Sequence, residues 1–249
     1  MDLRLRDTVV LVTGASRGLG AAIAVELAAE GAYVVAAARS RDGLREVEAK
    51  GDGRISAVEA DMRDEAAVAG LVEKVVERHG RIDGLINNAG IAPAGKFVDQ
   101  DPQVWKDTLA VNVIAPMLLA QAAGRHMIAQ GGGRIVNIAS TTGLRGKPVL
   151  VGYSTSKGAV IRMTEALAAE WASKNIQVNA IAPGAFVTEA QKAVLESPEL
   201  LRRRVAKIPA GRMADPAELV PLACLLVSPL SSFTSGATFV VDGGEVGKL

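Results

Sequence analysis

The stretch VLVTGASRGLGAAIAVELA, residues 10–28, decides the fold. It runs from an apolar, β-branched segment through Gly14, Gly18 and Gly20 into a segment of helical period. Glycines at such a turn allow positive φ angles and the close approach of a ligand, and the N-terminus of the following helix attracts an anion. The spacing G-x-x-x-G-x-G departs from the usual G-x-G-x-x-G dinucleotide fingerprint, however, and a purely structural tight turn also fits the three glycines.

Six more short apolar runs follow this first one, and most are separated by segments of helical period. The predicted strands lie within residues 8–14, 32–39, 54–61, 82–90, 134–140, 176–184 and 238–244. The predicted helices span residues 18–31, 64–79, 102–130, 153–174 and 216–227. Nearly continuous apolar strands are typical of a parallel sheet covered by helices on both faces. We therefore predict an α/β fold, a doubly wound (Rossmann) parallel sheet in a single domain of residues 1–249.

The bulk composition argues against several classes of partner. The 249 residues carry 28 Lys and Arg against 27 Asp and Glu, so the net charge of +1 gives no field to attract a nucleic acid or an acidic membrane. Cys224 is the only cysteine, and its apolar helical surroundings favour a buried position. We find no signal-peptide pattern and no apolar span of bilayer length. These observations predict a cytoplasmic protein without a nucleic-acid or membrane partner, and we predict no metal site.

Residues 186–216 form a long insertion between the sixth and seventh predicted strands. Insertions at the carboxyl ends of strands in this architecture usually border the ligand crevice. We interpret the segment as a substrate lid, although a plain surface excursion fits equally well.

The pentapeptide YSTSK places Tyr153 and Lys157 four residues apart at the start of a predicted helix, and this spacing puts both side chains on one face. A nearby ammonium stabilises phenolate and lowers the pKa of a phenol from about 10, which would make Tyr153 a usable general acid and base. Ser140 ends the fifth predicted strand, at the sheet edge where ligands bind, and its hydroxyl can bond a substrate oxygen. Each residue taken singly also fits a structural role, as a cap or an exposed pair.

These motifs, in their order along the chain, resemble those of the short-chain dehydrogenases/reductases. The resemblance rests on TGASRGLG at residues 13–20, NNAG at residues 87–90, Asn112, Ser140, the pair Tyr153 and Lys157, and Pro183, Gly184 and Thr188. It covers essentially the whole chain and implies an oxidoreductase that moves a hydride between a nicotinamide and a ketone or secondary alcohol. The alternative is a non-catalytic dinucleotide-binding sensor, which would have no need for all four side chains Asn112, Ser140, Tyr153 and Lys157.

The same resemblance implies roles for individual side chains. Ser140 orients the carbonyl, Tyr153 exchanges a proton with it, Lys157 also holds the nicotinamide ribose, and Asn112 supports a water and the lysine. The residues implied in cofactor binding are Gly14, Ser16, Arg17, Gly18, Leu19, Gly20, Arg39, Asp61, Met62, Asn88, Ala89, Gly90, Tyr153, Lys157, Pro183, Gly184, Phe186 and Thr188. Phe186 stands where an isoleucine is frequent in the family, and we expect its ring to narrow the pocket.

The end of the second predicted strand bears on the choice of nicotinamide cofactor. A carboxylate there would bind a free ribose 2′-hydroxyl and repel a 2′-phosphate. This chain has Ala38 followed by Arg39, and Arg17 in the glycine loop is free to reach the same region. Two cations and no acid favour NADP(H), with NAD(H) possible, although both arginines also fit a solvated surface. Asp61 and Met62 resemble the adenine contacts of the family, and a helix-entry role fits Asp61 equally.

Residues 141–152 follow Ser140 and should line one wall of the site for a small carbonyl or alcohol substrate. They combine apolar side chains with Arg145 and Lys147, and two cations at the mouth favour an anionic substrate unless both point to solvent. The family likeness leaves two substrate classes open, that of a 3-oxoacyl-carrier-protein reductase and that of a gluconate or sugar-acid dehydrogenase. It also implies a homotetramer, formed through the two long predicted helices and the C-terminal strand region.

Overall fold

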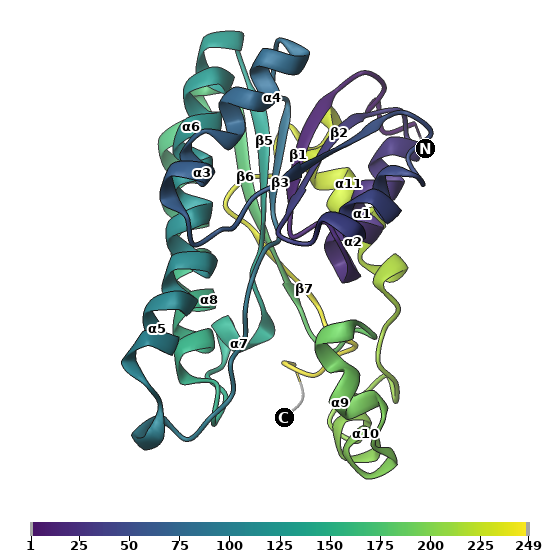
Figure 1. The fold of residues 1–249 in the computed structure, drawn as a ribbon, viewed down its shortest axis with the longest axis vertical. Coiled ribbons are helices and arrows are strands. Elements are labelled where there is room, and N and C mark those ends of the chain that lie inside the picture. Colours follow the sequence, from purple (N-terminus) through teal and green to yellow (C-terminus); the bar gives the residue numbers. More distant parts are fainter. Residues whose placement is uncertain (1, 248–249) are drawn as a thin grey trace.

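A computed structural model describes residues 2–247, and these form one twisted sheet of seven parallel strands (Figure 1). The strands are β1 Val9–Thr13, β2 Tyr33–Ala38, β3 Ile55–Glu59, β4 Gly84–Asn87, β5 Gly133–Ile138, β6 Ile176–Pro183 and β7 Thr238–Val241. Their order across the sheet is β3-β2-β1-β4-β5-β6-β7, and every neighbouring pair is parallel. The doubly wound α/β prediction is confirmed. Residues 1, 248 and 249 of the predicted domain lie outside the described residues.

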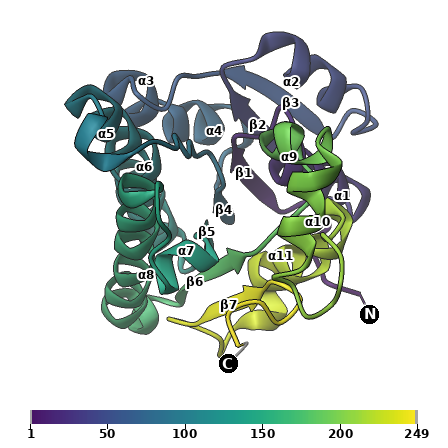
Figure 2. The same ribbon diagram turned by 90° about the horizontal axis from the view of Figure 1, so that it is seen from below.

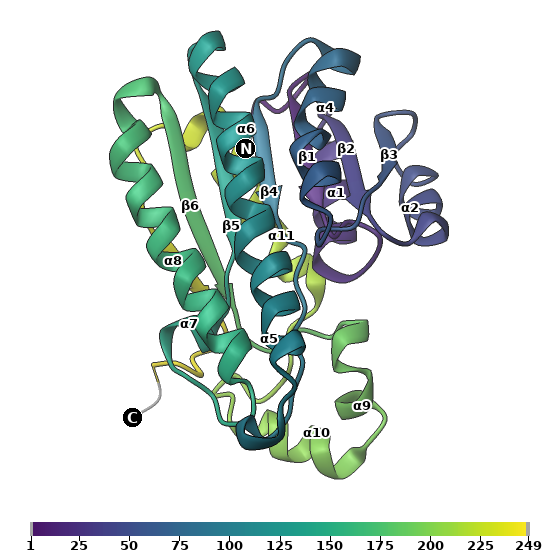
Figure 3. The same ribbon diagram turned by 60° about the vertical axis from the view of Figure 1, so that its left-hand side comes forward.

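Helices cover both faces of this sheet. The α-helices are α1 Gly18–Ala29, α2 Arg41–Glu48, α3 Glu65–Ala69, α4 Leu71–His79, α5 Pro102–Leu109, α6 Ala115–Gln130, α7 Thr141–Leu144, α8 Val151–Trp171, α9 Lys192–Leu195, α10 Pro198–Val205 and α11 Val220–Val227. Helices α1, α2 and α11 pack on one face, and α4, α6 and α8 pack on the other (Figures 1 and 3). The sequence did not predict α2, α7, α9 or α10, which are short.

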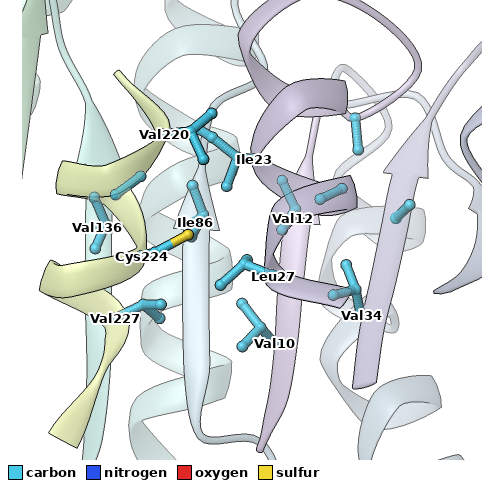
Figure 4. Close-up of a cluster of buried hydrophobic side chains, with 14 of the residues drawn as sticks. Val10, Val12, Ile23, Leu27, Val34, Ile86, Val136, Val220, Cys224 and Val227 are labelled. Carbon is cyan, nitrogen blue, oxygen red and sulfur yellow. The ribbon is translucent and has the colours of Figure 1, made fainter. Parts of the chain in front are cut away.

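The central strands are apolar on both sides because each side packs against helices. Along β1, Val10 and Val12 belong to the cluster under α1 and α11, whereas Val9 and Leu11 belong to the cluster on the opposite face. Figure 4 shows the first cluster, in which Cys224 of α11 lies beside the strands. Burial raises the pKa of the Cys224 thiol to about 12, so the predicted buried cysteine is confirmed.

The point where the strand order reverses lies at β1 and β4. From β1 the chain moves outward to β2 and β3, and then returns to β4 on the other side of β1. Ligands of open α/β sheets bind outside the carboxyl ends of the strands at such a point. The glycine loop follows β1 and the NNAG segment begins at the end of β4, so the fold brings these two predicted cofactor segments together.

Two predicted helices differ in detail from the prediction. The helix over residues 64–79 is broken at Gly70 into α3 and α4, and Asp64 caps α3 by accepting hydrogen bonds from two backbone N–H groups of its first turn. The helix over residues 102–130 is interrupted by a π-helical turn at Ala110–Ile114, between α5 and α6. Such turns arise in otherwise regular helices and are frequent at functional sites.

The helix over residues 102–130 is also long and apolar enough to cross a membrane by length and composition alone, contrary to the expectation that the chain has no such span. Its most apolar window is 56% buried inside the protein. Leu119, Ala123 and Met127 of this helix belong to the core under the sheet, and a core helix of a soluble protein passes the same test. This helix is therefore weak evidence for a membrane span.

The predicted lid, residues 186–216, folds into a short 3-10 turn at Glu189–Gln191 followed by α9 and α10. A small apolar cluster of its own holds it together, formed by Ala185, Ile208 and Met213 with Leu195, Leu201 and Val205 packed against them. Helices α9 and α10 project beyond the carboxyl edge of the sheet, on the side of α1, while α5 and α7 lie on the other side (Figures 1 and 2). This position borders the strand ends on which a ligand would bind, and the lid role stays a prediction.

Candidate active site

The glycine loop is shaped by close backbone contacts with the NNAG segment. Gly14 has a φ of +63°, and a Cβ added to it would lie 2.8 Å from the Cα atom of Ala89. A Cβ at Gly20 would lie 2.4 Å from the Nδ2 atom of Asn88, which donates hydrogen bonds to the Thr13 carbonyl at 2.9 Å and the Gly14 carbonyl at 3.1 Å. Close backbone packing therefore requires glycine at both positions, as the interpretation of a structural tight turn proposed. Both positions lie in the predicted cofactor turn.

The N-terminus of α1 is open to a ligand. Gly18 begins the helix with a φ of +58°, and Arg17 before it is extended and caps the helix with no side-chain hydrogen bond. Free N–H groups and the positive end of a helix dipole form a site for a phosphate. A Cβ at Gly14 would collide with the Ala89 backbone, and the helix start beside this turn, which no side chain of Arg17 caps, is suited to the pyrophosphate of a dinucleotide.

The cations predicted to meet a ribose phosphate lie at the rim of this turn. Ala38 is buried at the end of β2, and Arg39 follows it on the surface. Arg17 is 71% exposed in its side chain and pairs with Glu189 of the predicted lid at 3.2 Å. Sequence analysis did not reveal this partner, because 172 residues separate the two side chains along the chain.

Asp61 and Met62 follow β3 in the same region. Arg63 binds the Asp61 carboxylate through two guanidinium nitrogens, the shorter contact being 2.6 Å, and this hydrogen bonding holds the pKa of Asp61 below its usual value. The helix-entry role suggested for Asp61 belongs instead to Asp64, which caps α3. Met62 is buried in the core on the α4 side.

Tyr153 and Lys157 lie in the first two turns of α8, as predicted. The Lys157 ammonium is buried, donates a hydrogen bond to the Ile138 carbonyl at 2.7 Å, and lies 5.8 Å from the centre of the Tyr153 ring. Burial lowers the pKa of Lys157 to about 8. Burial also raises the pKa of Tyr153, and a hydrogen bond with Ser140 acts in the opposite direction. The expected fall in the phenol pKa is therefore not found, since desolvation of the phenolate outweighs the other effects.

Ser140 takes the capping role that the sequence left open, and its substrate-binding role stays a prediction. Its hydroxyl caps α7 by accepting a hydrogen bond from the Thr142 N–H group at 3.1 Å, and it shares a hydrogen bond with Tyr153. The Thr142 hydroxyl donates a second hydrogen bond to it at 3.0 Å. Sequence analysis missed Thr142, although a hydroxyl two residues after Ser140 was visible in the letters STT.

Asn112 lies in the π-helical turn and connects three segments. Its Oδ1 atom accepts a hydrogen bond from the Ile91 N–H group, and its Nδ2 atom donates to the Ile91 carbonyl and to the Ser156 hydroxyl, each at 2.9 Å. The Ser156 hydroxyl in turn donates to the Tyr153 carbonyl at 2.7 Å. Ser156 is a site residue that sequence analysis missed. We call this group the catalytic wall: Asn112, Ser140, Tyr153, Ser156 and Lys157.

The loop after β6 connects the predicted nicotinamide side to the glycine loop. A Cβ at Gly184 would lie 2.6 Å from the Cβ atom of Asp242, so only glycine fits at this crossing. Thr188 lies beside Gly18, with its Cγ2 atom 3.5 Å from the position of an added Cβ. Phe186 is only 4% exposed and packs in the core cluster under α1 and α11, which differs from the expectation that its ring narrows the pocket.

Most of the remaining predicted residues lie along the same edge of the sheet. Asn88 and Ala89 each donate a backbone hydrogen bond to the Thr13 hydroxyl at 3.1 Å, and a Cβ at Gly90 would lie 3.4 Å from both Asn112 Oδ1 and Lys157 Nζ. Ser16, Leu19 and Pro183 belong to the glycine loop, the start of α1 and the end of β6. Within residues 2–247, no group of three His, Cys, Asp or Glu side chains is arranged to hold a metal ion.

Comparison with known proteins finds relatives over nearly the whole chain. A family model described as enoyl-(acyl carrier protein) reductase matches residues 14–245. The chain is 40% identical over 241 residues to gluconate 5-dehydrogenase of Gluconobacter oxydans (strain 621H), covering 94% of this chain and 93% of that one. It is 37% identical over 248 residues to 3-oxoacyl-[acyl-carrier-protein] reductase of Thermotoga maritima, covering 98% of this chain and 100% of that one.

A solved structure adds a ligand-bound comparison. The gluconate 5-dehydrogenase of Burkholderia cenocepacia J2315, in complex with NADP and tartrate, has a TM-score of 0.93 and 34% sequence identity, covering 100% of this chain and 98% of that one. The matches span the whole length, and the motifs that carried the resemblance lie together at one edge of the sheet. The chain is therefore an oxidoreductase that belongs to the short-chain dehydrogenase/reductase family.

Proposed function

We propose that the protein is an NADP(H)-dependent dehydrogenase/reductase that interconverts a ketone and a secondary alcohol on a sugar acid. The observation that carries this proposal is the catalytic wall, which gathers a hydroxyl, a phenol and a buried ammonium from β5 and α8 at the carboxyl edge of the sheet. A protein that only senses a dinucleotide has no need for this set of side chains.

The proposed cofactor preference rests on charge. Residues 36–40 at the end of β2 contain no carboxylate, and Arg39 and Arg17 both lie exposed at the rim of the glycine loop. Arginine binds phosphate oxygens through paired N–H groups, so the two side chains are suited to a ribose 2′-phosphate. The Burkholderia relative, whose structure is a complex with NADP, supports the same choice.

The proposed mechanism assigns one task to each side chain. The bound nicotinamide supplies or accepts the hydride. Ser140 binds the substrate oxygen, and Tyr153 gives that oxygen a proton in reduction and removes it in oxidation. Because burial raises the pKa of Tyr153, its phenol is protonated at neutral pH and ready to act as the acid. Lys157 is held by the Ile138 carbonyl and keeps a positive charge next to the ring.

The sugar-acid proposal rests on the relatives that act on gluconate or ketogluconate. A 3-oxoacyl thioester is the second candidate. The Thermotoga relative supports it, as do Leu144, Val149 and Val151, which expose apolar surface in the segment after Ser140.

A substrate panel tests the proposal. The protein is mixed with NADPH or NADH and, in turn, with a keto-sugar acid, a neutral ketose and a 3-oxoacyl thioester, and absorbance at the nicotinamide band is followed. We expect turnover of the keto-sugar acid with a higher kcat/KM for NADPH. Turnover of the thioester alone would favour the second candidate, and turnover of none of the three would contradict both.

We also propose that the protein is a cytoplasmic homotetramer. Support comes from exposed apolar side chains on the outer surface of α6 and at the β7 edge of the sheet, namely Met117, Ile128, Phe233 and Val240. An uncovered strand edge and exposed apolar side chains are both features that assembly would bury. Light scattering that reports a monomer at micromolar concentration would contradict the assembly.

A further inference from the structure

A partly buried ion pair joins the predicted lid to the C-terminal segment. The Arg204 guanidinium of α10 binds the Glu245 carboxylate through two contacts, at 2.6 and 2.7 Å. Their side chains are 15% and 18% exposed, and among the ion pairs within residues 2–247 no other has both partners below one fifth. The pairs of Arg203 with Glu199 and of Lys192 with Glu196, which also lie in the lid, are solvated. The Arg204 pair is therefore the one that water screens least.

Lys147 lies in the segment after α7, and its charge interacts with the charges of Arg204, Lys207 and Glu245. The Lys147 backbone N–H group donates a hydrogen bond to the Ser154 hydroxyl at 3.2 Å. Ser154 lies in the first turn of α8 and directly follows Tyr153, so this bond holds the Lys147 backbone beside that turn. The Lys147 side chain is half-buried. Burial and the positive charges of Arg204 and Lys207 lower the pKa of Lys147, and the negative charge of Glu245 opposes them. Lys147 is therefore within electrostatic reach of the lid and the C-terminal segment.

The charges in this cluster do not balance. Lys147, Arg204 and Lys207 carry three positive charges, and Glu245 provides one carboxylate that Arg204 already binds at both oxygens. Lys147 makes no ion pair of its own within the described residues. Like charges at a half-buried position repel one another more strongly than in water, and an added anion relieves that repulsion. Lys147 lies in the segment that follows α7, and α10 lies across the carboxyl edge of the sheet from α7 (Figure 2).

We propose that Lys147 is a specificity-determining residue that binds the carboxylate of the substrate, with Arg204 and Glu245 holding the lid in position beside it. This inference rests on the proposed function, because it concerns the substrate of the same site. It narrows the substrate to an anionic sugar acid and excludes a neutral polyol as the preferred compound. Arg145, which lies two residues earlier in the same loop, is fully on the surface and takes no part.

The test compares a keto-sugar acid with its neutral amide, which has nearly the same size. For the wild-type protein with NADPH, we expect kcat/KM to be higher for the acid than for the amide. Lys147→Met should lower kcat/KM for the acid by about 10- to 100-fold, the range of a hydrogen bond to a charged group, and change that for the amide by less than about threefold. Lys147→Arg should keep most of the preference for the acid over the amide, and Lys147→Glu should reverse that preference.

Arg145→Met is the matched control, since it removes one positive charge from the same loop. Equal losses of kcat/KM for the acid in Lys147→Met and Arg145→Met would overturn the inference. The general positive potential of the loop would then explain both losses. A wild-type protein that reduces acid and amide equally well would also overturn it while leaving the proposed function intact. A protein that reduces neither compound but reduces other ketones would contradict the proposed substrate class, and with it this inference.

A phosphorylated carrier arm would bring negative charge to the same mouth. A 3-oxoacyl coenzyme A thioester and the neutral N-acetylcysteamine thioester therefore form a second pair of substrates. A Lys147→Met effect confined to this second pair would assign the anion to a carrier and overturn the carboxylate assignment. Circular dichroism and light scattering on each variant would establish that fold and assembly are unchanged.

Discussion

The catalytic wall and the outer rim of the cofactor turn are built differently. Side chains of the wall are mostly buried and bound to backbone or to one another at 2.7 to 3.1 Å. The rim, which we define as Arg17, Arg39 and Glu189, is exposed, and its ion pair lies in solvent. Groups that react must be held in place before the substrate arrives, whereas groups that bind a flexible, charged ligand are able to rearrange around it. We therefore expect changes in the wall to affect kcat strongly and changes in the rim to affect binding moderately.

The largest expected effect is that of Tyr153→Phe. The change removes the proton donor and leaves the ring that packs beside Lys157. General acid–base catalysis contributes typically about 10²- to 10⁴-fold, so kcat should fall by that factor while the Kd for NADPH changes little. Steady-state kinetics and fluorescence titration measure the two quantities. Thr155→Ala, an exposed residue two positions later in the same helix, is the control and should keep its activity. A Tyr153→Phe protein with full turnover would remove the catalytic role of the wall.

Arg39→Ala probes the rim and should have the next largest effect. Loss of one guanidinium from a phosphate site weakens NADPH binding by about 10- to 100-fold, the range of a charge-assisted hydrogen bond, and leaves NADH nearly unchanged because NADH has no 2′-phosphate. Calorimetric titration with both cofactors measures this. Arg45→Ala is a suitable control, since Arg45 lies on α2 and pairs with Asp42. Equal weakening of NADPH and NADH would show that Arg39 acts on the shared part of the dinucleotide.

The pH dependence of turnover tests the proton-transfer role of Tyr153 without a substitution. With a phenol pKa raised by burial, Tyr153 stays protonated from pH 6 to 8, so kcat/KM for ketone reduction should be flat there. Alcohol oxidation needs the phenolate, and its rate should rise by up to about tenfold for each pH unit. A reduction rate that falls through a pKa near 7 would show that the bound cofactor and Lys157 depress the phenol pKa, as the sequence argument alone predicted. Tyr153→Phe should remove the dependence.

The sequence predicted the strands, the sheet class and the proximity of Ser140, Tyr153 and Lys157 because each rests on local pattern. Residues at fixed spacing, such as Tyr153 and Lys157, are brought together by one helix, and Ser140 by the end of one strand. It missed Ser156 as the link from Asn112 to Tyr153, because that link needs a π-helical turn placed beside α8. Contacts between side chains far apart in the sequence require the folded chain.

The surroundings of the Lys147 charge show the same limit of sequence analysis. The sequence identified Lys147 as a cation but left open whether solvent surrounds it. Only the fold brings the charges of Arg204 and Glu245 within electrostatic reach of it, from segments about 60 and 100 residues further along the chain. The direction of the Tyr153 pKa was wrong for a similar reason. A four-residue spacing reveals a neighbouring ammonium but says nothing of the burial that raises the phenol pKa.

The smallest expected effect concerns Glu189, the lid residue that pairs with Arg17. A bound 2′-phosphate or pyrophosphate would compete with the Glu189 carboxylate for the Arg17 guanidinium, and would be repelled by that carboxylate. Glu189→Gln should therefore strengthen NADPH binding. Because the ion pair is exposed, with side chains 71% and 67% accessible, the gain should stay within about fivefold and should shrink as salt is added. Glu196→Gln, which removes an equally exposed lid carboxylate paired with Lys192, is the matched control. If both variants strengthen binding equally, net charge alone explains the gain. If Glu189→Gln weakens binding instead, the pair orders the lid for the cofactor, and the rim is then as preorganised as the wall.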